Sequence, residues 1–233
     1  MITPRDAEIH RLIAGSLCLD FANTLHGHRG HPLHEYLWDY RDVVLWSRHA
    51  GLIDEGQAGV LLQQAEKYPD RAEVVHRKAI DLREMIFRIF SRLAVGDSPE
   101  MSDLDRLCTL HLEALRQRRL SRVGSGYVWG WEDELNMERL LWPIVISAVD
   151  LLTSEEVDRV RECNGDGCDW LFVDGSRNHL RRWCSMDQCG NRSKMKRRYA
   201  MRKGNHLQIT LERGNLAGDG KTLREPGFAW NDT

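Results

Sequence analysis

The chain of 233 residues is 42% hydrophobic and 29% charged, which is typical of a water-soluble protein with one large domain or two small ones. Its longest apolar run, 140–152, is too short to span a bilayer, and its first residues contain no apolar signal core, so we expect a cytoplasmic protein with no membrane partner. The net charge is −2, but the charges are unevenly distributed. Residues 1–160 are acidic, with 19 Lys and Arg against 26 Asp and Glu, whereas residues 161–233 are basic, with 14 against 9. The basic region favours a polyanionic partner.

Apolar residues at helical spacing predict six helices before residue 153. In the strongest pattern, Val75, Ala79 and Leu82 recur at intervals of three or four residues, and Gly96 follows the last apolar position. Alternating aromatic residues predict a small β-hairpin over 120–131. The expected helices cover 6–26, 36–50, 55–67, 71–95, 102–117 and 137–152. This order predicts a mainly α fold, with an N-terminal helical bundle and one small hairpin.

A change of composition near residue 155 predicts a domain boundary, because Gly, Cys and Arg become frequent after it. We expect a helical domain over 1–155, a small zinc finger over 156–203 and a Gly-rich polar tail over 204–233. The finger has few large apolar residues, so bound metal would supply much of its folding free energy. The helical domain is expected to fold without it.

Four of the six cysteines fall within a short stretch after the predicted boundary, as Cys163-x4-Cys168-x15-Cys184-x4-Cys189. Two close pairs with about 15 residues between them are typical of a structural four-thiolate zinc site. Residues 170–173 predict a strand, and Asp174-Gly175 predicts a hairpin turn. With a helix after Cys189, this order predicts a treble-clef-like finger with one structural zinc ion. The alternative is four cysteines without metal.

Ten basic residues lie between 177 and 203, and only Asp187 opposes them. A cationic helix on a metal-stabilised platform can make many phosphate contacts. The alternative is a solvated charged face, or pairing with the acidic region. The residues that we expect to contact nucleic acid are Arg181, Arg182, Arg192, Lys194, Lys196, Arg197 and Arg198.

Polar residues interrupt the apolar pattern of the first helix at Asp20, Asn23 and Thr24. They could line a small-ligand pocket with Arg83, but a buried polar network that fixes helix packing explains them better. Four histidines, His26, His28, His31 and His34, do not have the spacing of a second metal site. We expect the tryptophans Trp38, Trp46, Trp129, Trp131 and Trp142 to be core or interface residues rather than a base-stacking platform.

Two segments resemble known families. The C-terminal segment resembles the CGNR zinc finger in Cys189-Gly190-Asn191-Arg192 and in Arg-Arg-Trp-Cys-Ser-Met over 181–186. The same family is resembled by Asp-Gly-Ser-Arg-Asn over 174–178, where Gly175 stands at a position at which threonine is commoner. Leu-Cys-Leu-Asp-Phe-Ala-Asn-Thr over 17–24 resembles the opening motif of the ABATE domain, which typically precedes this finger.

This resemblance, over about 10–203, implies a bacterial stress-induced transcription regulator with a helical N-terminal domain and a zinc-binding, DNA-binding C-terminal domain. It implies Cys163, Cys168, Cys184 and Cys189 as the zinc ligands. The sequence contains no recognisable catalytic motif, so we expect no enzyme. The helical domain would be a sensor of a small ligand or an assembly module, for instance in a homodimer. The alternative is a zinc-stabilised protein-interaction or ligand-binding protein without specific DNA binding.

Overall fold

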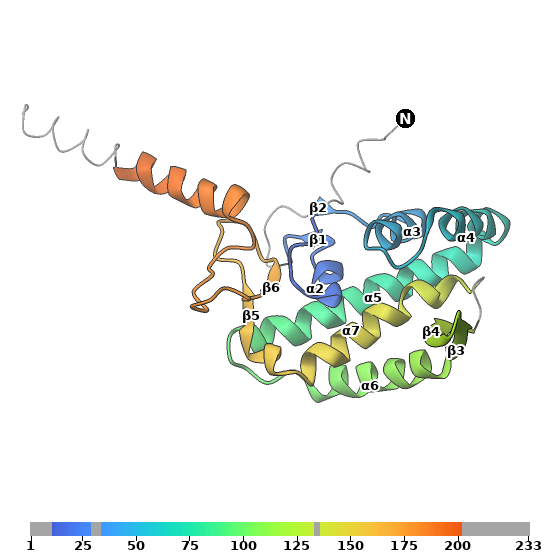
Figure 1. Cartoon of the computed structure of the whole chain (residues 1–233). Coiled ribbons are helices and arrows are strands. Elements are labelled where there is room, and N and C mark those ends of the chain that lie inside the picture. The colour runs from blue at the N-terminus through green and yellow to red at the C-terminus, as the bar shows by residue number, and fades with distance from the viewer. Residues whose placement is uncertain (1–10, 29–33, 133–135, 202–233) are drawn as a thin grey trace, which may run out of the picture. The chain divides into compact units, whose positions relative to one another are not determined.

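The computed structural model describes residues 11–28, 34–132 and 136–201 (Figure 1). The chain divides into two compact units, one that ends at Gly190 and one that begins at Asn191. The first unit contains the helices that precede residue 153 and the four-cysteine cluster, and the second contains one described helix, over 191–201. None of the helices in the described ranges is long and apolar enough to cross a membrane.

The described part of the first unit is mainly helical, as the sequence predicts. Its α-helices are α2 (Leu17–Ala22), α3 (Tyr40–His49), α4 (Glu55–Lys67), α5 (Pro69–Ala94), α6 (Met101–Arg116) and α7 (Trp142–Leu152). Short 3₁₀ helices cover Met137–Leu140 and Glu155–Arg159. Three two-stranded antiparallel sheets pair β1 (Leu25–His26) with β2 (His34–Glu35), β3 (Arg118–Val123) with β4 (Gly126–Trp131), and β5 (Val160–Glu162) with β6 (Leu171–Val173).

Helix α5 connects the parts of this unit, because it contacts α2, α3, α4, α6 and both strands of the β5–β6 sheet. It begins with Pro69 in its first turn, where a missing N–H costs nothing. Its buried side chains follow the helical period from Val75 to Phe90. Gly96 follows the helix with a φ of +84°, a left-handed conformation that glycine adopts without strain. The strongest helix of the sequence is thus the helix on which α2, α3, α4 and α6 pack.

The first helix is shorter than the sequence predicts: within the described residues it begins at Leu17. Gly15 has a φ of +80°, which interrupts the helical conformation. The Asp20 carboxylate accepts a hydrogen bond of 2.9 Å from the backbone N–H of Ala14, which fixes this preceding segment against the start of α2. Residues 1–10, the first part of the expected helix, lie outside the described residues.

The strand over 171–173 pairs with a strand that the sequence did not predict. After a 3₁₀ turn over Glu155–Arg159, the chain forms β5, which pairs with β6. Asp174-Gly175 does not begin a hairpin. Instead the buried Asp174 carboxylate accepts hydrogen bonds from the backbone N–H groups of Ser176 and Arg181 and from the Ser176 hydroxyl, and this turns the chain away from the sheet.

The β5–β6 sheet and the cysteines share one core with the helices. Leu171 and Phe172 are fully buried and belong to the same apolar cluster as residues of α2 and α5. The buried Asn23 amide donates to the carbonyl of Leu171 at 2.9 Å and accepts from its N–H at 2.8 Å. Val173 N–H donates to the carbonyl of Ala14 at 2.7 Å. Independent folding on either side of the boundary at 155/156 stays a prediction, and these contacts make it testable.

Replacing Asn23 with alanine should destabilise the helices and the cysteine region together. The Asn23→Ala variant leaves the N–H and C=O of Leu171 buried without partners, so we expect the free energy of unfolding to fall by about 2 kcal/mol or more. Urea unfolding would be followed by circular dichroism and by thiol reactivity. Asn178→Ala, at an exposed position, is the control. Two separate transitions in these probes would show that the helical region folds on its own.

Candidate metal centre and basic surface

The four cysteines of the predicted metal site come together in the structure. Their sulfur atoms lie within 4.8 Å of one another, and all four residues are buried. The Sγ atom of Cys184 is 3.7 Å from that of Cys168 and 3.7 Å from that of Cys189. In the described residues this is the only group of three or more potential ligands at such spacing. Four soft, buried thiol ligands with no fifth protein group match a closed structural zinc site.

Backbone geometry builds the cluster from two short loops. The N–H groups of Gly165 and Cys184 donate to the Cys163 sulfur at 3.3 and 3.2 Å. Gly167 has a φ of +69° and turns the first loop back toward Cys168. A Cβ atom on Gly165 would lie 2.9 Å from both Cβ and Sγ of Cys189, so this position requires a residue without a side chain.

Ionisation of one thiol in the cluster opposes ionisation of the others. Contacts with the Cys168 and Cys184 side chains lower the pKa of Cys163 to about 7. The same contacts raise the pKa values of Cys168 and Cys184, for which hydrogen bonding to Cys163 is the largest cause. The Cys163 thiolate therefore forms easily, and its negative charge opposes deprotonation of the neighbouring thiols. A divalent cation would remove this opposition, because metal ligation requires deprotonated sulfur.

Arg181 and Arg182 have different environments, although they are neighbours in the predicted basic surface. The Arg181 guanidinium donates to the carbonyls of Trp183, Cys184 and Ile13, and lies over the Phe172 ring at 4.3 Å. Arg181 thus holds the second cysteine loop onto the core. Arg182 is exposed and lies over the Trp183 ring at 5.7 Å.

A basic helix, residues 191–201, follows the second cysteine pair. A π-helical turn, Met186–Gly190, carries Cys189 and leads into it. The helix contains no acidic residue, and its side chains are exposed all round except for a half-buried Ser193. Its exposed cations are Arg192, Lys194, Lys196, Arg197 and Arg198. Arg202 and Lys203, which complete the predicted stretch, lie outside the described residues.

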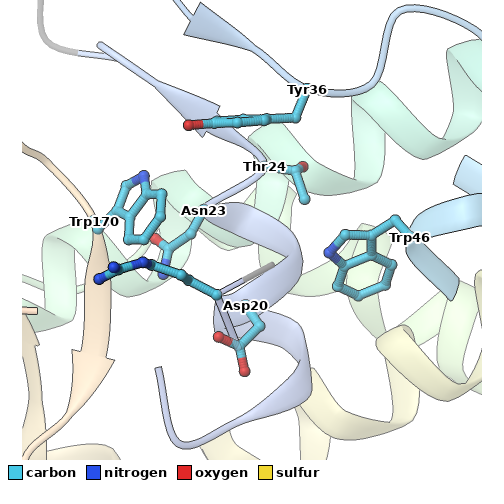
Figure 2. Close-up of a pocket in the computed structure, with 7 residues that line it drawn as sticks. Asp20, Asn23, Thr24, Tyr36, Trp46 and Trp170 are labelled. Carbon is cyan, nitrogen blue, oxygen red and sulfur yellow. The ribbon is translucent and has the colours of Figure 1, made fainter. Parts of the chain in front are cut away.

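Asp20 of α2 and the two polar residues that follow this helix line a small cavity (Figure 2). Asp20, Asn23 and Thr24 line a cavity of about 20 Å³ with Tyr36, Trp46 and Trp170, which is room for about one water molecule. Thr24 donates to the carbonyl of Phe21 at 2.7 Å, and Asn23 binds Leu171, so both side chains serve the packing. Arg83 pairs with Glu35 instead, through two bonds of 2.6 and 2.8 Å.

His28, one of the four histidines weighed as a metal site, has a buried side chain that connects the first cysteine loop to α5. The His28 ring stacks on Phe87, with centroids 3.6 Å apart. Its Nε2 is 3.6 Å from Glu84, and its Nδ1 is 3.8 Å from Asp169, which follows Cys168. Burial lowers the pKa of His28, although these two carboxylates oppose the effect. The histidine spacing gave no sign of this role, because its partners are distant in sequence.

A helical body that carries a buried four-cysteine cluster defines a zinc-finger protein of the mainly α class. Comparison with protein families agrees: residues 15–155 match the ABATE family, described as "Putative stress-induced transcription regulator", and residues 159–203 match the CGNR zinc finger. The chain belongs to the ABATE family, with a CGNR zinc finger following the ABATE domain. No curated protein matches the chain.

Removing thiol ligands should abolish metal binding. We expect the purified protein to contain one zinc ion per chain and the Cys184→Ser/Cys189→Ser variant to contain none, because two ligands cannot complete a tetrahedral shell. Gly165→Ala should weaken zinc affinity through the crowding at Cys189. Metal analysis and chelator competition measure both effects. Cys108→Ser, at an exposed cysteine, is the control and should keep its zinc. A folded wild-type protein without zinc would contradict the assignment.

Stability should depend on pH through Asp20. Burial raises the pKa of Asp20 from 3.8 to about 6, so the folded state binds a proton that the unfolded state has already released. The Asp20 contribution to stability is therefore full below about pH 4 and is lost as the pH rises through about 6.

The Asp20→Asn variant should remove this dependence. Relative to this variant, the wild type should lose on the order of 1–3 kcal/mol between about pH 4 and pH 7. Urea unfolding of both proteins across that range measures the difference. The matched control is Asp150→Asn, at an exposed position on α7. A difference that does not change with pH would show that the pKa of Asp20 is not raised in the folded state.

Proposed function

We propose that this protein regulates transcription by binding DNA through the basic helix, with one structural zinc ion holding the finger from which that helix starts. The observation that supports this most strongly is the exposure of five cations on a helix with no acidic residue, directly after Cys189. Charge of this density matches the phosphate backbone of DNA. Membership in a family described as transcription regulators supports the same function.

The helix offers phosphate contacts in two directions. At 100° per residue, Lys194, Arg197 and Arg198 share one face of it, and Arg192 and Lys196 lie on the opposite face. Arg182, exposed beside Trp183, adds a further cation. Arg181 acts through the cysteine loop that it holds, not through phosphate. These contacts would give affinity and position, since phosphates carry no base sequence directly.

The helical domain would act as a sensor or an assembly module rather than an enzyme, in a cytoplasmic regulator. A groove of about 680 Å³ lies between the α4–α5 junction and the start of the 3₁₀ helix Met137–Leu140. Its lining includes Tyr68, Arg71, Val74 and Asn136. It is large enough for a small ligand, unlike the cavity beside Asp20.

A homodimer would bring two basic helices to one duplex. The competing proposal, a protein-interaction module without specific DNA binding, draws on the same cationic helix.

Charge reversal on the basic helix should weaken duplex binding. If about six phosphates are neutralised, the affinity should fall by about a thousandfold between about 50 and about 200 mM salt. Arg197→Glu/Arg198→Glu should weaken binding to every duplex sequence alike and reduce the salt dependence. Gel-shift and anisotropy titrations with mixed genomic fragments measure this.

The matched control is Arg41→Glu/Lys67→Glu, which makes the same change of charge at exposed positions on α3 and α4. This variant should bind as the wild type does. If both double variants lose affinity equally, only net charge matters and the helix is not the contact surface. Salt-dependent self-association without a duplex shift would favour the protein-interaction module.

A further inference from the structure

The β3–β4 hairpin carries exposed aromatic and aliphatic side chains that its own fold does not bury. Among the tryptophans expected in a core or an interface, Trp46 and Trp142 are buried, but Trp129 is 59% exposed. Tyr127 is 70% exposed and Leu120 is 60% exposed. Exposure of this kind on a structured element indicates a surface that binds something.

The strand register places these side chains on one face. Arg122 is opposite Tyr127, Leu120 opposite Trp129, and Arg118 opposite Trp131. Side chains two residues apart point to the same side of a strand, so the rings of Tyr127, Trp129 and Trp131 form a row. Their spacing along the strand is about 7 Å, twice the rise per nucleotide of a stacked strand. We call this face, residues 118, 120, 122, 127, 129 and 131, the aromatic face.

The charge of the hairpin favours an anionic occupant. The two strands contain three arginines and no acidic residue, and because Arg119 pairs with Glu132, Arg118 and Arg122 supply the charge of the aromatic face. The Arg118 guanidinium lies 5.5 Å from the ring centroids of both Trp129 and Trp131. Arg122 is exposed opposite Tyr127. One arginine thus lies over Trp129, and another is at the register position opposite Tyr127, so a phosphate next to a stacked base would have a cation within reach.

The base of the hairpin is anchored, so the aromatic face is presented on a fixed support. Trp131 packs against Trp142 of α7, with ring centroids 5.2 Å apart. Arg119 pairs with Glu132, and Glu132 N–H donates to the carbonyl of Gln117 at 2.8 Å. Figure 1 shows the hairpin at the C-terminal end of α6, in the compact unit that ends at Gly190. The surface therefore belongs to the helical domain and is distinct from the basic helix.

We propose that the aromatic face binds single-stranded nucleic acid, by stacking unpaired bases on Tyr127 and Trp129 and pairing their phosphates with Arg118 and Arg122. This gives the helical domain a nucleic-acid contact of its own, for strands whose bases are free to stack. It does not depend on the proposed duplex binding by the finger. Bases of any sequence present a ring to stack on, so little sequence preference is expected.

The test uses full-length Arg197→Glu/Arg198→Glu protein, so that the basic helix does not obscure the result. Anisotropy titrations compare labelled oligothymidylate of about 15 nucleotides with an abasic strand of equal length and charge, and with the RNA counterpart. Stacking predicts that the abasic strand binds about tenfold more weakly or worse. Tyr127→Ala/Trp129→Ala should lower the affinity for both base-carrying strands about tenfold or more and remove the preference over the abasic strand. Trp38→Ala, at a tryptophan that is 62% exposed elsewhere, is the matched control and should bind unchanged.

Equal affinity for the abasic and base-carrying strands would overturn the proposal, because charge alone would then explain binding. Unchanged affinity in Tyr127→Ala/Trp129→Ala, with unfolding transitions like those of the wild type, would overturn it as well. Sedimentation of the same variants identifies the main competitor. If the alanine variant dissociates a dimer and leaves oligonucleotide binding intact, the aromatic face is a self-association surface. Failure of duplex binding in the earlier test would leave this result unaffected.

Discussion

Burial of the β5–β6 sheet against α2 and α5 is the interaction on which the rest of the structure depends. The Asn23 amide satisfies both backbone groups of Leu171, and Phe172 is fully buried beneath the Arg181 guanidinium. A strand of three residues has little stability of its own, so the helices supply the apolar surface that it needs. Because Cys163 and Cys168 lie between the two strands, the first cysteine loop is fixed by the helical body.

The arginine side chains have different roles, and these follow from this arrangement. Arg83 and Arg181 are directed inward, one to the carboxylate of Glu35 and one to carbonyls around the second cysteine loop. Arg83 is buried and Arg181 is half-buried, and such groups require partners because an unpaired buried charge is costly. Arg197 and Arg198 extend from a helix exposed all round and can meet an external anion. Net charge alone does not distinguish the inward-directed arginines from those of the basic helix, although only the arginines of the basic helix suit DNA.

The proposals assign different chemistry to different surfaces. The thiol cluster has no open ligand position, so its role is to hold backbone in place. The basic helix offers charge without aromatic support except for Tyr199. The hairpin offers aromatic rings flanked by arginines, which suits bases that are not paired.

The sequence by itself determined the mainly α class, the order of the helices and the identity of the four clustered cysteines, because helical periodicity and ligand spacing are local properties. It also carried the motifs of both families. Tertiary structure decided which residues distant in sequence contact one another. These contacts are the pairing of β5 with β6, the hydrogen bonds between Asn23 and Leu171, and the position of His28 between Glu84 and Asp169. It also decided that Trp129 is exposed while Trp46 is buried. These outcomes depend on which surfaces meet in space, and no local pattern of residue types records that.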